Sequence, residues 1–237
     1  MTAVDRATPT QDIAQPDASG RLRRLGGALA LVLAPWGFVI ANASYAWMIR
    51  NGGSDSTGAE ALALAATGPD VLRLAIAAGM IGCLLIIPAV LTASSRARRS
   101  RLAFVGGSLM IAGYVCYFGV LLSNMIIIAM AEHGGPLVDY AAVIDANQSD
   151  LWTAWVFSIF VVGNLLGTLL FAIGLLRSRR VPAWAAILIM LWPPLHVIGL
   201  IIDGEVLEVL GAVLQAIGFA GIAVAVLRHQ IEGPSVG

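Results

Sequence analysis

The sequence predicts an all-α integral membrane protein with six transmembrane helices, paired as three hairpins, and with both termini in the cytoplasm. Composition is the first observation behind this prediction. The 237 residues are 59% hydrophobic and 12% charged, whereas a soluble domain carries about a quarter charged residues. The second is six apolar runs that meet the ~20 residues needed to cross the hydrocarbon. The third is that arginine-rich and acidic loops alternate, and cytoplasmic loops hold the positive charge.

The charged residues separate by sign along the chain. The loops assigned to the cytoplasm hold Arg21, Arg23 and Arg24, then Arg96, Arg98, Arg99 and Arg101, then Arg177, Arg179 and Arg180, then Arg228. The loops assigned to the outside hold Asp55, Glu60 and Asp70, then Glu132, Asp139, Asp145 and Asp150, then Asp203, Glu205 and Glu208. The formal net charge is zero, so no global field favours a nucleic-acid partner. Anionic membrane lipids are the expected partners of the arginine clusters, and the plasma membrane is the expected location.

The apolar runs predict spans at 25–48, 71–93, 102–131, 151–176, 182–202 and 207–227. Residues 1–20 are polar and contain prolines, which predicts a disordered cytoplasmic tail. Residues 21–230 form the predicted six-span domain, and residues 231–237 form a second short cytoplasmic tail. The third run is the longest, so we expect it to tilt or to project from the membrane.

The first span has a second interpretation. Arginines, an apolar stretch and then Ala41-Asn42-Ala43 resemble a signal peptide with its cleavage site. Cleavage would leave five spans. Retention is favoured because the apolar stretch is longer than a usual signal core, and because an internal repeat includes this span.

The internal repeat has a period of 80 residues. Gly26-Gly27 matches Gly106-Gly107, and Asp70 matches Asp150. Each unit is one hairpin, and the fifth and sixth spans form a third hairpin with a shorter outer loop. Units of two spans keep the same orientation, so the sequence predicts a parallel pseudo-repeat about an axis along the membrane normal.

The two long outer loops predict short helices on the membrane surface. Gly134-Gly135 is expected to end a helix before Pro136 starts the next. One face of that next helix would carry Leu137, Tyr140, Ala141 and Ile144. Residues 57–67 predict a similar helix. Asp70 and Asp150 each precede a descending span, where we expect them to cap helix N-termini.

Polar residues within the predicted spans are candidates for function, because polar groups are costly at membrane depth. The expected outer half holds Asn42, Asn124, His196 and Gln215, and Asn164 lies near the middle. If these side chains face inward, they line a ligand pocket that opens to the outside. The alternative is that they hydrogen-bond neighbouring helices.

His196 is the most distinctive of these candidates. It follows Trp192-Pro193-Pro194, and the two prolines are expected to disturb the helix. Asp203 follows seven residues later, with Glu205 and Glu208 in the next turn. A histidine beside carboxylates could bind a divalent cation, with His196, Asp203 and Glu205 as ligands, or relay protons. The alternative is that the carboxylates mark the aqueous edge and cap the sixth span.

Other features indicate structure rather than chemistry. No catalytic motif is recognisable, no cofactor is predicted, and no pair of histidines at one level suits haem. Cys83 and Cys116 lie within apolar runs, where a disulfide is not expected. Gly163 and Gly167 form a G-x-x-x-G that could pack helices closely. Salt bridges to Asp55, Glu60 or Asp70 are expected for the two outer arginines, Arg50 and Arg73.

Three segments resemble a known class of proteins. They are R-x-x-G-G at Arg23–Gly27, T-G-P-D at Thr67–Asp70 and L-L-I-I-P-A-V-L at Leu84–Leu91. The chain resembles small bacterial multi-pass membrane proteins of unknown function. The resemblance implies a helical multi-pass fold and carries no functional residue.

Three functional hypotheses remain open. The first is binding or transport of a small lipophilic molecule, with the protein acting alone or as a homo-oligomer. Its outward-facing pocket would contain Asn42, Asn124, Asn164, His196 and Gln215. The second is an accessory role, in which the outer surface helices bind a partner membrane protein. The third is an enzyme at the outer leaflet, with His196 as base.

Overall fold

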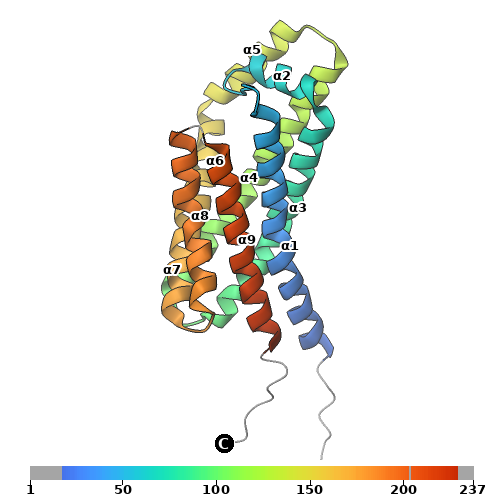
Figure 1. The fold of residues 1–237 in the computed structure, drawn as a ribbon. Coiled ribbons are helices and arrows are strands. Elements are labelled where there is room, and N and C mark those ends of the chain that lie inside the picture. Colours follow the sequence, from blue (N-terminus) through green and yellow to red (C-terminus); the bar gives the residue numbers. More distant parts are fainter. Residues whose placement is uncertain (1–17, 203, 229–237) are drawn as a thin grey trace, which may run out of the picture.

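The computed structural model describes residues 18–202 and 204–228, and Figure 1 shows how its helices are arranged. The helices are α1 (Ala18–Ile49), α2 (Gly58–Thr67), α3 (Pro69–Arg96), α4 (Arg101–His133), α5 (Leu137–Ser149), α6 (Leu151–Val162), the π-helical turn η1 (Gly163–Gly167), α7 (Thr168–Ser178), α8 (Ala183–Ile201) and α9 (Glu205–Arg228). The predicted tail at 231–237 and nearly all of the tail at 1–20 lie outside the described residues.

Six helical segments are long and apolar enough to cross a membrane, as the sequence predicts. They are α1, α3, α4, the continuous segment from α6 through η1 to α7, α8 and α9. The chain is therefore a polytopic, all-α membrane protein. The first of these segments continues through Ala41–Ala43 and is packed on α3 and α9, so the first run is an integral part of the bundle.

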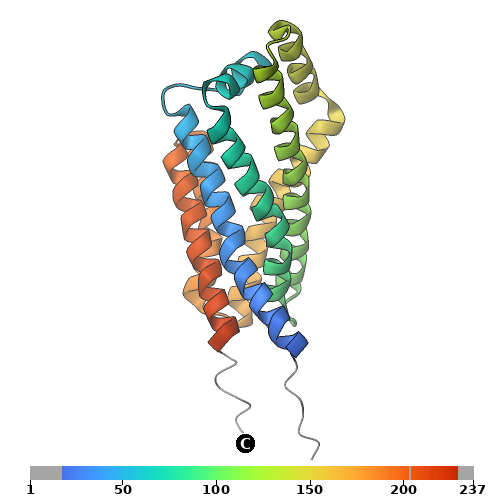
Figure 2. The same ribbon diagram turned by 90° about the vertical axis from the view of Figure 1, so that its right-hand side faces the viewer.

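Consecutive spans pack as antiparallel hairpins. α1 packs on α3, α4 packs on η1 and α7, and α8 packs on α9. The bundle closes because α1 also packs on α9 and α3 on α4. Figures 1 and 2 show an elongated bundle in which the described chain begins and ends at the same end.

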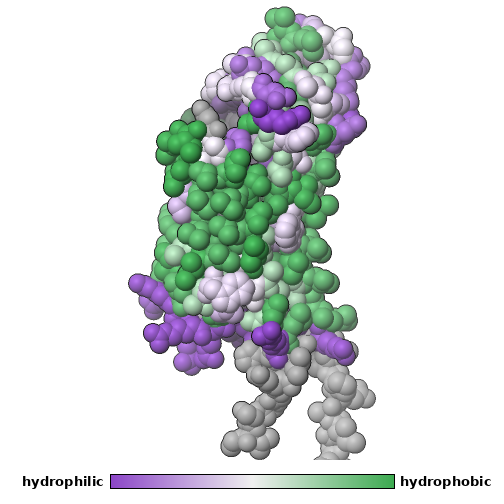
Figure 3. Space-filling model, in the orientation of Figure 1, coloured by the Kyte–Doolittle hydropathy of each residue, from purple (hydrophilic) through white to green (hydrophobic). Residues whose placement is uncertain are grey.

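The two ends of the bundle differ in charge. We call the end with Arg23, Arg96 and Arg177 the arginine end, and the end with Glu132 and Asp145 the acidic end. Figure 3 shows a hydrophobic band between two hydrophilic ends. This distribution suits an apolar membrane interior between two aqueous boundaries.

Glycines allow α4 to approach the fourth span closely. A Cβ on Gly163 would lie 2.4 Å from the Leu109 carbonyl oxygen and 2.6 Å from the Gly113 Cα. A Cβ on Gly167 would lie 2.6 Å from the Met110 nitrogen. The G-x-x-x-G prediction is confirmed, because only residues without a side chain permit this backbone contact.

At the acidic end, α2 and α5 pack on each other and on α4. Thr57 and Glu60 form a capping box at the start of α2, and the backbone N–H of Gly58 donates to Oδ1 of Asp145 at 2.6 Å. The predicted face of α5 is used in this packing, because Ile144 is buried and Gly58 lies against the Ala141 carbonyl. Ala141 and Ile144 therefore face the protein, whereas Leu137 at the start of the same face is 50% exposed.

Two of the predicted helix ends are confirmed, and one cap is wrong. Gly134 ends α4 with a φ of 69°, which is the left-handed conformation that favours glycine. Asp150 caps α6 by accepting from the backbone N–H groups of Trp152 and Thr153. Asp70 does not cap α3, because α3 begins one residue earlier, at Pro69. Its carboxylate instead pairs with Arg73 at 3.0 Å.

The disturbance expected at Pro193-Pro194 does not interrupt the helix, because α8 continues as an α-helix from Ala183 to Ile201. Proline has a φ that fits a helix, so the cost is limited to lost hydrogen bonds and ring contacts one turn earlier. The irregular turn lies elsewhere, at η1 in the middle of the fourth span. Single π-turns inside α-helices are frequent at functional sites.

Candidate ligand-binding site

The clearest polar contact inside the bundle joins α8 to α9. Nδ1 of His196 lies 3.0 Å from Oε2 of Glu208, within ion-pair range. The direction of approach is not that of a hydrogen bond, so Nδ1 has no hydrogen-bond partner among the described residues. The Glu208 residue is only 6% exposed. An acidic residue this deeply buried in an apolar bundle needs a compensating partner, and His196 is placed to be one.

Two neighbours fix the geometry of this pair. The His196 ring stacks on Trp192, one turn earlier, with ring centroids 5.0 Å apart. Gly199 lies against Glu208, since a Cβ on Gly199 would fall 2.8 Å from the Glu208 Cγ. The glycine therefore lets the first turns of α9 approach α8, which brings the carboxylate to the level of the imidazole.

Trp192 also connects His196 to the other polar candidates. It forms a small buried cluster with Val39, Ala212 and Ala216, against which Leu165 and Val213 pack; we call this the Trp192 cluster. Leu165 directly follows Asn164 in η1, and Ala216 directly follows Gln215 in α9. Three of the five predicted ligand-binding residues, His196, Asn164 and Gln215, therefore lie around one packing centre shared by four spans.

Four buried polar atoms in this region have no hydrogen-bond partner among the described residues. They are Asn164 Oδ1, Thr168 Oγ1, His196 Nδ1 and Gln215 Nε2. Each such atom costs about 1–3 kcal/mol unless another group pairs with it. Together they supply both hydrogen-bond donors and acceptors. Such a set is suited to a polar guest molecule.

The half of the fourth span toward the acidic end differs from its other half. α7 packs on both α4 and α8, whereas α6 packs mainly on α4 and on η1. α6 has no buried residue. The span therefore leaves the bundle centre at η1, which is the turn that carries Asn164.

The other two predicted ligand-binding residues are not part of this arrangement. The side chain of Asn42 donates to the Phe38 carbonyl in its own helix at 3.0 Å. Asn124 is half-buried on α4, a helix that contributes nothing to the Trp192 cluster. Thr168 and Glu208 belong to the region but were not among the predicted ligand residues. Thr168 follows Asn164 by one helical turn, a spacing that could have indicated it.

The structure does not test the predicted metal site of His196, Asp203 and Glu205 as a whole. Asp203 lies outside the described residues, and within the described part of the chain no three His, Cys, Asp or Glu side chains are placed to hold a metal ion. His196 instead approaches Glu208. Both cysteines, Cys83 and Cys116, are free thiols.

The two outer arginines have different partners. Arg73 forms the expected ion pair with Asp70 and a second one with Glu132 on α4. Arg50 stacks over the Trp47 ring, with its guanidinium carbon 3.6 Å from the ring centroid, and donates to the Trp47 carbonyl. Arg50 is therefore held by a cation–π contact rather than by the expected salt bridge.

Two cavities of about 660 and 620 Å³ lie at the arginine end. None of the five predicted ligand-binding residues lines either of them. Neither of these cavities therefore belongs to the region around His196.

Comparison with protein-family models, with curated proteins and with solved structures gave no match to this chain.

Proposed function

We propose that the protein binds a small lipophilic molecule with hydrogen-bonding groups, at a site beside η1, α8 and α9 that opens toward the acidic end. The unpaired buried atoms of Asn164, Thr168, His196 and Gln215 carry this proposal. Polar side chains in a membrane bundle are rare because they are costly. A guest with a donor and an acceptor would remove that cost. Release to the opposite side of the membrane would make the protein a carrier.

The proposal includes an orientation and a location. Arginine-rich loops stay in the cytoplasm, so the arginine end is cytoplasmic and the acidic end faces out. The membrane is the plasma membrane. The guest reaches its site from outside or from the outer leaflet. Because the Glu208 carboxylate already lies against His196 and the unpaired atoms of Asn164, Thr168 and Gln215 are neutral, an uncharged guest fits better than an ion.

Native mass spectrometry of the protein in mild detergent tests this proposal. We expect one small-molecule adduct per chain that is absent from His196→Ala and from Gln215→Leu. Asn42→Leu is the matched control, because the Asn42 amide already has a partner in its own helix, and it should retain the adduct. An adduct that survives in all three variants, or a protein without any adduct, contradicts the proposal.

The melting temperature of the Gln215→Leu variant distinguishes a ligand-binding role of Gln215 from a packing role. In the absence of ligand, Gln215→Leu removes a buried Nε2 that has no hydrogen-bond partner among the described residues, but it also removes the hydrogen bond between Gln215 and Tyr114. The two effects should offset, so the melting temperature should change little. A packing role for Gln215 predicts instead a lower melting temperature and an unchanged adduct.

A second candidate is a role as an accessory protein that binds a partner through α5. The observation that favours it is Val138, which is 83% exposed on a helix outside the six spans. It predicts that Val138→Asp abolishes co-purification of a partner, whereas His196→Ala does not. The enzyme hypothesis is the least favoured of the three.

A further inference from the structure

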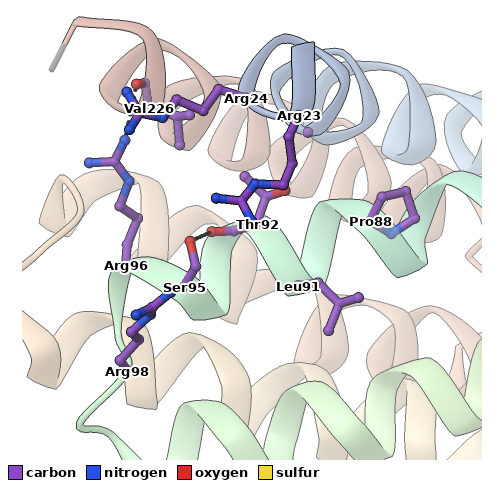
Figure 4. A pocket seen from close by; sticks show the side chains of 10 residues that line it. Arg23, Arg24, Pro88, Leu91, Thr92, Ser95, Arg96, Arg98 and Val226 are labelled. Carbon is purple, nitrogen blue, oxygen red and sulfur yellow. Dashed lines mark hydrogen bonds between the residues drawn. The ribbon is translucent and has the colours of Figure 1, made fainter. Parts of the chain in front are cut away.

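The larger cavity at the arginine end has a composition suited to a specific ligand. Its volume is about 660 Å³, and α1 and α3 form most of its wall, with Val226 of α9 completing it. Figure 4 shows the side chains of this wall, which are those of Arg23, Arg24, Pro88, Leu91, Thr92, Ser95, Arg96, Arg98 and Val226. A wall with four arginines and an apolar side is amphipathic.

The charge on this wall is not neutralised by the described part of the protein. No acidic residue of the described chain lines the cavity, and the ion pairs within the described residues all lie toward the acidic end. Arg24 and Arg96 lie close enough for their charges to interact. Two cations at this distance repel each other, and a bound anion would relieve that repulsion.

One of these arginines is held in place. Nη2 of Arg96 donates to the carbonyl oxygen of Val226 at 3.0 Å, close to the C-terminus of α9, where the helix dipole favours a cation. A guanidinium has five N–H donors, so most of those of Arg96 remain for another acceptor. A planar fork of donors matches a phosphate group and can bind two of its oxygens.

The apolar side of the cavity continues onto the membrane-facing surface. Pro88 and Leu91 line the cavity, and Leu91 is 59% exposed on α3. Leu84, two turns away on the same helix, is exposed to the same degree. An acyl chain could follow this row from the cavity into the hydrocarbon. A free anion has no acyl chain and would not contact this row of apolar side chains.

We propose that this cavity binds an anionic lipid through its phosphate group. Arg23, Arg24, Arg96 and Arg98 contact the phosphate, and one acyl chain lies along Pro88 and Leu91. The site is separate from the region around His196, so it stands or fails independently of the proposed function.

The test measures lipid binding by native mass spectrometry, with the protein titrated with phosphatidylglycerol and, separately, with phosphatidylcholine. The variant is Arg24→Gln with Arg96→Gln. The control is Arg101→Gln with Arg179→Gln, which removes the same charge at the same end from residues that line neither cavity. Because a basic residue at a membrane surface contributes about 1 kcal/mol to anionic-lipid binding, the variant should bind phosphatidylglycerol about 30-fold more weakly.

The proposal is supported by one tightly bound phosphatidylglycerol per chain that the variant loses and the control keeps. Equal losses in variant and control, or equal binding of phosphatidylcholine, would overturn it. The single variant Arg24→Gln should still fold, since among the described residues Arg24 has no hydrogen bond comparable to that of Arg96 with Val226. It should still weaken phosphatidylglycerol binding several-fold. Inorganic phosphate alone, titrated as a competitor, distinguishes the source. If millimolar inorganic phosphate displaces phosphatidylglycerol, the ligand of the cavity is a free phosphate and the lipid proposal is wrong.

Discussion

The imidazole of His196 and the carboxylate of Glu208 lie 3.0 Å apart between α8 and α9. The contact joins the last hairpin to the Trp192 cluster through the stacked rings of His196 and Trp192. Breaking a buried pair by removing one partner costs more than replacing both, because it leaves a buried polar group uncompensated.

A double-mutant cycle at this pair follows from that argument. His196→Leu and Glu208→Leu should each lower the free energy of unfolding by about 3 kcal/mol. The double variant should lose clearly less than the sum of the two. Reversible unfolding in mild detergent, followed by circular dichroism, gives the three values. Losses that add to within about 0.5 kcal/mol would show that the two side chains act independently.

Glycine spacing on the fourth span provides a second prediction. Gly163→Ala places a methyl group against the backbone of α4 and should destabilise the protein by about 1–3 kcal/mol, since the helices must separate. The control is Gly119→Ala on α4, where a Cβ meets nothing within 4 Å. It should be neutral or stabilising by up to about 1 kcal/mol, because alanine favours a helix over glycine. Equal melting temperatures for the two variants would contradict the close packing.

The six spans could be predicted because composition and charge alternation act over whole segments and do not depend on partners. Local chemistry also placed the cap at Asp150 and the end of α4 at Gly134. α3 begins at Pro69, two residues before its predicted start, and this shift turns Asp70 from a cap into the partner of Arg73. Roles that depend on a single residue position are lost when a helix boundary moves by two residues.

The partner of His196 could not be predicted, because it depends on how α9 packs against α8. Spacing along one helix favoured Asp203, but α8 ends at Ile201. Glu208 reaches the imidazole only because Gly199 lets the two helices approach. The π-turn at Gly163–Gly167 has no signal of its own in the sequence beyond its glycines. Long-range packing, rather than periodicity, determines both features.

The orientation of the bundle gives a third prediction, which cysteine labelling tests in a Cys83→Ser, Cys116→Ser background. Ser56→Cys lies in an exposed loop at the acidic end, and Arg99→Cys lies in an exposed loop at the arginine end. The positive-inside rule predicts that a membrane-impermeant maleimide labels Ser56→Cys in intact cells. Arg99→Cys should react only after permeabilisation. The reverse pattern would invert the proposed topology and place the His196 region on the cytoplasmic side.

The contact between α2 and α5 provides the last prediction. Asp145 accepts from the backbone N–H of Gly58 at 2.6 Å, a bond between the two helices outside the six spans. Asp145→Ala leaves that N–H without its acceptor, so the first turn of α2 should open more often. For a loss of about 1 kcal/mol, amide hydrogen exchange there should become about fivefold faster. The control is Asp139→Ala, whose exposed carboxylate has no described partner, and it should leave exchange unchanged. The rest of α2 should keep its protection in both variants, because Leu62 and Ala65 remain buried. If exchange rises across the whole helix instead, the hydrogen bond rather than apolar packing holds α2 on the bundle.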